Sequence, residues 1–396
     1  MILITYTNKN IFIFLLHLKE HTYFFMLTKP KLKRFIALSL LSLFTCTNPV
    51  APEYQFIDGM IYIDGFIGTT EGSSYVNVTE SDVALYYRNI FVSGANISFV
   101  NAISGKRIAL YEDDSKYIPE DFNFKGEVGE KWYLEANLPN GKKYLSEIET
   151  INPSIPIKDI SVKYDKQLEY VEDYNKYVPG HEVSVTFDDP EDQTNYYYWR
   201  YKTYDKVQIC KICYEGKFRD NKCIDAPNVD YYTYYCDSNC WQIDYSNTIK
   251  IFSDKFSNGI TTSSYPVGNV LLTRKTKVLV EIQQFSITPK AYEYYRAIKD
   301  LVDNNGGFNA PLPAALIGNM YNPEDSNEFV LGRFTAASAT TKSIMIDRTT
   351  VEESSIETPI KPKPEPPPTS PGPVYDKAPC EESRSKTSIE PIGWIE

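Results

Sequence analysis

Short stretches of alternating apolar and polar residues recur along this chain, and a period of two is typical of half-buried β-strands. Residues 60–68 alternate in this way and end at a glycine. Residues 92–100 follow the same pattern behind a Ser-Gly turn. Several short strands with turns at this spacing predict an antiparallel β-sandwich of immunoglobulin or transthyretin type over residues 57–150.

The clearest hairpin signal lies at Asn140-Gly141 within residues 131–148. These two residue types readily adopt the positive φ angles that a tight hairpin turn requires. In the strand that precedes the turn, alternate residues share one face. The residues predicted on its buried face are Trp132, Leu134, Ala136 and Leu138.

A proline-containing connector leads into a second β-rich region, residues 155–345, which we expect to be sandwich-like. Its strand patterns lie at 160–164, 183–187, 195–202 and 277–287. The many Tyr, Phe, Val, Ile and Thr residues agree with a mainly β protein, because these types are enriched in strands.

One α-helix is predicted at about residues 289–303, between strands of this second region. Thr288 is a suitable N-cap, and Pro289 fits the first turn, where its missing N–H is not needed. Tyr292, Tyr295 and Leu301 recur near helical spacing.

The composition changes from about Glu352 onward, where prolines dominate. Few residues there can bury apolar area, and proline favours an extended backbone. We therefore predict that residues 352–396 form an extended, disordered tail that acts as a spacer.

The beginning of the chain resembles a bacterial lipoprotein signal. A basic cluster at residues 29–34 precedes a ten-residue apolar run that is too short to span a bilayer. Cys46 closes this run, although Thr45 stands where a smaller residue is commoner in lipid-attachment motifs. The interpretation is a signal peptide over residues 1–45 and acylation of Cys46. An ordinary secretory signal with a chance cysteine is the alternative.

Met26 gives a more compact signal peptide than Met1, so residues 1–25 are interpreted as a spurious extension. Residues 46–56 form the lipidated linker. Cleavage removes six basic residues and one acidic residue, which takes the net charge from −11 to −16. A strongly acidic chain is poorly suited to phosphate backbones, so nucleic acid is not an expected partner. The membrane would be contacted through the lipid anchor.

Five cysteines lie within one predicted insertion, residues 205–245. They are Cys210, Cys213, Cys223, Cys236 and Cys240. An exported chain meets an oxidising compartment, which favours disulfides, and the cysteine left unpaired could reach Cys380. The spacings Cys210-x2-Cys213 and Cys236-x3-Cys240 also suit zinc. We prefer disulfides, and the spacing does not decide the pairing.

Catalytic motifs are absent from the sequence. The mature chain has a single histidine, His181, which follows Pro-Gly in a predicted solvated loop. Acidic residues at 188–192 could hold calcium or serve a hydrolase, but solvated strand ends commonly carry such clusters. No catalytic residue, metal ligand or cofactor is therefore predicted, and we expect the protein not to be an enzyme.

Tyrosines offer the best candidate contact surface. Residues of this type combine a rigid apolar ring with a polar tip and are enriched at interfaces. The preferred cluster lies in the cysteine-rich insertion rather than in a scaffold strand, and consists of Tyr231, Tyr232, Tyr234 and Tyr235.

Several separated motifs resemble one family, in the same order along the chain. They are Ile61-Tyr-Ile-Asp-Gly-Phe-Ile, Val92-Ser-Gly-Ala-Asn-Ile-Ser-Phe, Asp188-Asp-Pro with Asn195-Tyr-Tyr-Tyr-Trp-Arg, Ser286-Ile-Thr-Pro-Lys-Ala-Tyr-Glu-Tyr-Tyr, Ile317-Gly-Asn-Met and Leu331-Gly-Arg-Phe-Thr-Ala-Ala-Ser. From Cys46 to Ser343 the chain is similar to the family catalogued as domain of unknown function 4249.

This resemblance implies an outer-membrane lipoprotein that is accessory to a TonB-dependent transporter, with no assigned catalytic residues. The expected role is noncatalytic, in nutrient uptake or envelope assembly. A surface adhesin or glycan-binding module independent of a transporter is the alternative. The anchor could face the cell surface or the periplasm.

Overall fold

The computed structural model describes residues 59–82, 88–121, 123–246, 248–304, 317–357, 360–368 and 373–396. All of them belong to one compact unit, Phe56–Glu396. Cys46, the predicted signal peptide and the predicted lipidated linker lie outside the described residues. Among the described residues, no helix is long and apolar enough to cross a membrane.

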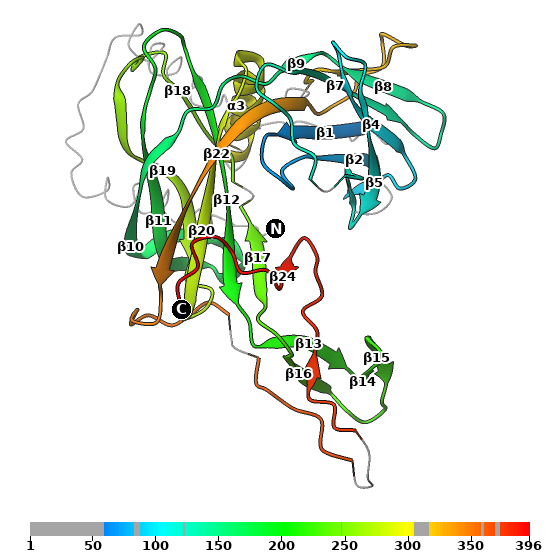
Figure 1. Ribbon diagram of the computed structural model, residues 1–396, viewed down its shortest axis with the longest axis vertical. Helices are drawn as coiled ribbons and strands as arrows, with labels where there is room; N and C mark the ends of the chain where they lie inside the picture. The colour runs from blue at the N-terminus through cyan, green and yellow to red at the C-terminus, as the bar shows by residue number, and fades with distance from the viewer. Residues whose placement is uncertain are drawn as a thin grey trace, which may run out of the picture. The chain divides into compact units, whose positions relative to one another are not determined.

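The first part of the unit is an antiparallel array of short strands (Figure 1). Its strands are β1 (Ile61–Gly68), β2 (Tyr75–Asp82), β3 (Arg88–Phe91), β4 (Asn96–Asn101), β5 (Arg107–Asp113), β6 (Lys116–Pro119), β7 (Lys131–Asn137), β8 (Lys143–Ser146) and β9 (Glu149–Thr150). The turn after β7 has Gly141 at a φ of 86°, as predicted, whereas Asn140 does not have the positive φ that the Asn-Gly signal also predicted.

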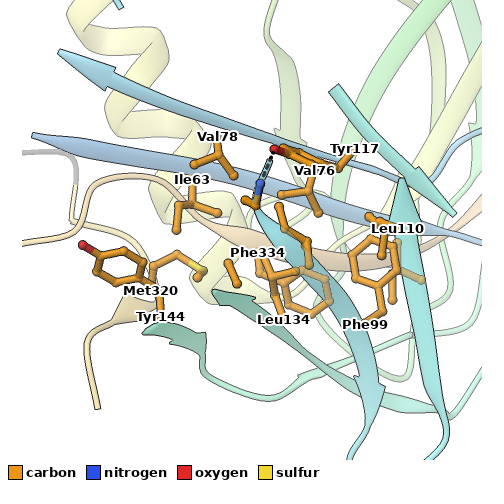
Figure 2. Close-up of a cluster of buried hydrophobic side chains, with 14 of the residues drawn as sticks. Ile63, Val76, Val78, Phe99, Leu110, Tyr117, Leu134, Tyr144, Met320 and Phe334 are labelled. Carbon is orange, nitrogen blue, oxygen red and sulfur yellow. Dashed lines mark hydrogen bonds between the residues drawn. The ribbon is translucent and has the colours of Figure 1, made fainter. Parts of the chain in front are cut away.

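The core of this first part confirms the alternation read from the sequence. Trp132, Leu134, Ala136 and Leu138 are all buried. Figure 2 shows Ile63, Val76, Phe99 and Leu134 converging on Phe334, which comes from the other end of the unit. In the same view the Tyr117 hydroxyl accepts a hydrogen bond of 2.9 Å from the backbone N–H of Ala95.

The second part is a sandwich of two sheets. The smaller sheet holds β10 (Ile157–Val171), β11 (Lys176–Asp188) and β19 (Thr261–Leu271), with a single 3₁₀ turn, Glu172–Tyr174, between β10 and β11. The larger sheet includes β12 (Tyr196–Lys206), β17 (Trp241–Tyr245), β18 (Lys250–Ser253), β20 (Lys277–Ser286) and β22 (Phe334–Asp347). Val183 and Val185 meet Val280 and Ile282 in the core between the sheets.

Strand β22 joins the two parts into one continuous sheet (Figure 1). Its first residues, Phe334 to Ala337, pair in parallel with Gly65 to Gly68 of β1. The rest of the strand pairs antiparallel with β20. The predicted boundary near residues 150–155 therefore does not separate two independent sheets, because a late strand completes the first one.

The chain that enters β22 runs very close to β1. Gly332 has a φ of 98°, and a Cβ atom at this position would lie 2.1 Å from the Ile63 carbonyl oxygen. Only glycine combines this backbone conformation with so close an approach. The short strand β21 (Met320–Tyr321) precedes this segment and pairs with β8.

The predicted helix is confirmed as α3 (Pro289–Asn304). The Thr288 hydroxyl accepts a hydrogen bond of 3.3 Å from the Ala291 N–H, which is the expected N-cap contact. Its buried face places Ala291, Tyr294 and Tyr295 in a cluster with Phe66 and Phe285. The helix thus packs where β1 approaches β20.

The cysteine-rich insertion forms its own small strands. They are β13 (Ile209–Tyr214), β14 (Gly216–Arg219), β15 (Lys222–Asp225) and β16 (Tyr231–Cys236). Two short strands of the chain end join this region and the larger sheet, namely β23 (Lys377–Ala378) beside β16 and β24 (Lys386–Thr387) beside β17.

The prediction of a disordered tail over residues 352–396 is wrong for its described parts. Glu365 forms an ion pair of 2.6 Å with Arg219, and Cys380 is disulfide-bonded to Cys240. Proline-rich composition signals an extended backbone. It does not reveal partners that lie more than a hundred residues earlier in the sequence.

A buried ion pair fixes the junction at which β9, the chain before β22 and the helix N-terminus meet. Arg333 donates a hydrogen bond to Glu149, and both side chains are at least 96% buried. Thr288 also donates to Glu149, at 2.9 Å. Burial raises the pKa of Glu149, and the Arg333 cation opposes this rise.

We predict that Glu149→Ala lowers the free energy of unfolding by about 3–5 kcal/mol, because it leaves the Arg333 charge buried without a partner. The matched control is Lys290→Ala at the exposed Lys290–Glu147 pair, with an expected loss of at most about 1 kcal/mol. Urea denaturation of both variants measures the difference. Equal losses would contradict the assigned role of the buried pair.

Candidate functional site

A cavity of about 940 Å³ lies between the two parts of the unit. One wall comes from β1, β2, β5 and β6, and another from β12, β17, β20 and α3. Residues of the segment 382–392 near the chain end form a third wall. The volume is at the upper end of the roughly 300–1,000 Å³ found for small-molecule sites.

Strand alternation explains which side chains reach the cavity. In β1, Ile61 and Ile63 enter the hydrophobic core, so Tyr62 and Asp64 face the other way. In β12, Tyr197 and Trp199 enter the core of the sandwich, and Tyr198 and Arg200 line the cavity. The two-residue alternation that places one set of side chains in each core therefore places the other set in the cavity.

Four of these side chains form a hydrogen-bonded chain. The Tyr75 hydroxyl donates to Oδ2 of Asp64 at 3.1 Å and accepts from Nη2 of Arg200 at the same distance. The Arg200 Nε donates to the Tyr198 hydroxyl at 3.0 Å. Tyr75 thus bridges a carboxylate and a guanidinium.

Aromatic rings surround the Arg200 guanidinium. Its Cζ atom lies 4.2 Å from the centre of the Phe66 ring and 5.0 Å from that of Tyr198. Cation–π attraction at such distances stabilises a partly desolvated charge. Arg200 is therefore held in one orientation by rings and phenol oxygens.

Burial shifts the pKa of Asp64 and the pKa values of the Tyr62 and Tyr75 phenols in the same direction. Burial raises the pKa of Asp64, and the Arg200 cation and the Tyr75 hydrogen bond oppose this rise. Burial also raises the pKa of Tyr62 and of Tyr75. The phenols consequently stay neutral hydrogen-bond donors at physiological pH.

Lys116 is the second cation of the cavity interior. Its Nζ lies 4.4 Å from the centre of the Tyr75 ring. Burial, followed by the charge of the nearby Arg384, lowers its pKa to about 8. Among the described residues, no carboxylate forms an ion pair with Lys116, Arg200 or Arg384.

The six cysteines described in the structure are paired. The disulfides are Cys210–Cys236, Cys213–Cys223 and Cys240–Cys380. The sulfur atoms of Cys210, Cys240 and Cys380 lie within 4.8 Å of one another. Each is already bonded to another sulfur, so the structure favours disulfides over the zinc alternative at these spacings.

The predicted tyrosine surface is divided by its own strand. Tyr234 is fully buried and donates a hydrogen bond of 2.8 Å to Glu365. Tyr235 is 39% exposed, and Tyr231 and Tyr232 are partly buried. The four residues therefore do not share one contact face, and the cluster prediction is corrected on this point.

His181 also differs from its prediction. It is buried in β11 beside the Tyr164 ring, with the ring centres 5.0 Å apart, rather than in a solvated loop. Burial lowers its pKa, and the Arg348 charge acts in the same direction. In the acidic loop, Asp189 accepts hydrogen bonds from Tyr197 and from the Gly259 N–H, which gives it a structural role.

Sequence reasoning missed the residues that define the cavity. Asp64 and Arg200 lie inside strongly apolar strand patterns, where a charged residue is costly unless it has a partner. A charged residue within an apolar strand pattern was therefore a visible sign in the sequence that Asp64 and Arg200 have partners. Their meeting with Lys116 and Arg384 depends on contacts between distant segments, which the pattern of one strand does not contain.

The family described as Domain of unknown function (DUF4249) matches residues 47–343, about three quarters of the chain, so the chain belongs to this family. Comparison with curated proteins gives no match. The matched segment contains Asp64, Lys116 and Arg200, and it ends before Arg384.

We predict that Lys116 makes stability rise with pH. Its pKa is about 8 when folded and 10.5 ordinarily, so between these values the unfolded chain binds more protons. The free energy of unfolding of wild type should therefore increase relative to Lys116→Gln as pH rises from 8 towards 10. Urea titrations along this range, with exposed Lys131→Gln as control, measure it. Parallel curves for wild type and Lys116→Gln would contradict the prediction.

We also predict unequal losses from two disulfides. Cys240–Cys380 joins residues 140 apart, and Cys213–Cys223 joins residues 10 apart. Longer closed loops restrict the unfolded chain more, so the Cys240→Ser/Cys380→Ser variant should lose about 2 kcal/mol more than Cys213→Ser/Cys223→Ser. Denaturant midpoints compare the two, and a larger loss from the short loop would rule the loop argument out.

Proposed function

We propose that this DUF4249 protein is a lipid-anchored, noncatalytic outer-membrane accessory of a TonB-dependent transporter and that it captures a solute in the cavity between its two parts. The cavity with its Asp64–Tyr75–Arg200 chain is the observation that carries the proposal. The polar groups of this hydrogen-bonded chain are fixed among aromatic rings, and placed polar groups beside aromatic side chains are typical of small-molecule sites.

The chemistry of the cavity supports capture rather than bond breaking. Asp64 already accepts a hydrogen bond from Tyr75, and its charge is compensated by Arg200. Arg200 is held by two phenol oxygens and by the Phe66 ring. Groups committed in this way can orient a ligand without moving a proton.

The anchor and the transporter enter the proposal from the sequence. Cys46 follows a basic and then an apolar stretch, as in lipoprotein signals. The transporter partner is proposed from the resemblance to the family. A capture protein on the same membrane would raise the local concentration of solute at the barrel, as linked sites do.

A glycan-binding module that acts without a transporter is the second candidate. Tyrosines from both parts of the unit line the cavity, among them Tyr62, Tyr111, Tyr201 and Tyr245. Such rings can stack on sugars, and their hydroxyls can bind sugar oxygens. This candidate shares the cavity and differs in the partner.

We expect a TonB-dependent barrel to co-purify with the wild-type protein from outer membranes solubilised in mild detergent. Mass spectrometry identifies the barrel, and crosslinking before solubilisation retains a weak complex. Cys46→Ser removes the acylation site and should reduce recovery of the barrel. Recovery of the wild-type lipoprotein alone, at full yield after crosslinking, would refute the transporter proposal and favour the glycan-binding module.

A further inference from the structure

We infer that the cavity contains an anion subsite built by Lys116, Arg200 and Arg384, and that the captured solute carries an acidic group beside a sugar-like ring. The inference rests on the proposed capture function and names the chemical class of its ligand. The shared chemistry is a negatively charged oxygen group, either carboxylate or phosphate.

The three cations come from separate elements. Lys116 begins β6, Arg200 lies in β12, and Arg384 comes from the segment near the chain end. Lys116 and Arg200 both lie against the Tyr75 ring, at 4.4 Å and 5.4 Å from its centre. Two elements distant in sequence therefore bring positive charge to one ring.

Arg384 is positioned by its own contacts. Its guanidinium carbon lies 4.6 Å from the centre of the Tyr245 ring, and its carbonyl oxygen accepts a hydrogen bond of 3.1 Å from the Tyr245 hydroxyl. The pairing of β24 with β17 and the Cys240–Cys380 disulfide hold the segment on either side. The third wall therefore contributes a charge at a defined place.

The cavity lining also has acidic residues, but among the described residues none of them forms an ion pair with these three cations. Glu281 pairs with Lys202 at 3.1 Å, and Glu382 accepts a hydrogen bond of 2.6 Å from the Ser388 N–H. Asp64 is bound to Tyr75, and its charge partly offsets the charges of Arg200 and Lys116. The remaining acidic side chains lie at exposed positions, namely Glu71, Asp113, Asp121 and Glu390.

Lys116, Arg200 and Arg384 thus have no ion-pair partner among the described residues. Burial and then the Arg384 cation lower the pKa of Lys116, and the Asp64 carboxylate opposes this shift without forming an ion pair with Lys116. An anionic group between these cations would relieve the repulsion and accept charge-assisted hydrogen bonds. Exposed tyrosines of the lining, Tyr111 and Tyr245, provide ring surface for the rest of the solute.

Isothermal titration calorimetry on the full-length protein in detergent tests the inference with four probes. Tetragalacturonate presents carboxylates on sugar rings, glucose 6-phosphate presents phosphate on a ring, inorganic phosphate presents charge alone, and maltotetraose is the neutral control. We expect at least one ring-bearing acid to bind more tightly than maltotetraose and than inorganic phosphate. The stronger of the two acids identifies the acidic group.

Charge variants give the second arm. Lys116→Gln and Arg384→Gln should each weaken binding of that acid by about tenfold or more, as expected for a lost charge-assisted contact. Arg384→Lys keeps the charge and should retain most of the affinity. Lys131→Gln, an exposed site outside the cavity, should change nothing. Arg384 is itself exposed, so its variants should fold even if changes at Lys116 do not.

Binding of maltotetraose as tight as that of both acids, no binding of either acid up to millimolar concentration, or unchanged affinity in both glutamine variants would overturn the inference. Co-purification of the transporter barrel with the Arg384→Gln variant distinguishes failure of the anion-subsite inference from failure of the proposed function. If the barrel co-purifies but neither acid binds, only the anion-subsite inference is refuted. Acid binding without a barrel defeats the transporter partnership and leaves the subsite in place.

Discussion

The double pairing of strand β22 is the constraint on which the rest of the structure depends. One end of the strand is parallel to β1 and the other end is antiparallel to β20, so the strand fixes both parts of the unit in one sheet. Just before it, Gly332 allows the chain to approach Ile63, and Arg333 is neutralised by buried Glu149. A buried charge without its partner would be strongly destabilising, so this junction specifies the register.

The cavity follows from that arrangement. Since β1 and β20 are both neighbours of β22, the faces of β1 and β12 that turn away from the two cores are brought towards each other. Asp64 and Arg200 occupy those faces and meet through Tyr75. A charged residue in each strand, unfavourable when the strand is considered alone, gains a partner only in the assembled sheet.

Local features of this fold were predictable from the sequence, and distant pairings were not. Thr288-Pro289 and Asn140-Gly141 determine the backbone only of residues next to them in the sequence. The helix and the hairpin were therefore predicted correctly. The pairing of β22 with β1 spans much of the chain, and the sequence indicated that Cys380 could pair with a cysteine of the insertion but not that this cysteine is Cys240. Alternation and spacing carry no information about such partners. For the same reason the Tyr231–Tyr235 cluster was judged by composition, although Tyr234 is committed to Glu365.

The segment near the chain end shows that composition can predict disorder where contacts with distant residues give an ordered structure. This matters for the cavity, because the segment forms its third wall. A proline-rich segment cannot build a core of its own. It can still be held against an existing one, and here a disulfide, two short strand pairings and the Glu365–Arg219 ion pair do so. The family match ends at residue 343, before all of these contacts. A family member without a comparable segment would therefore have a cavity that lacks its third wall and the charge of Arg384.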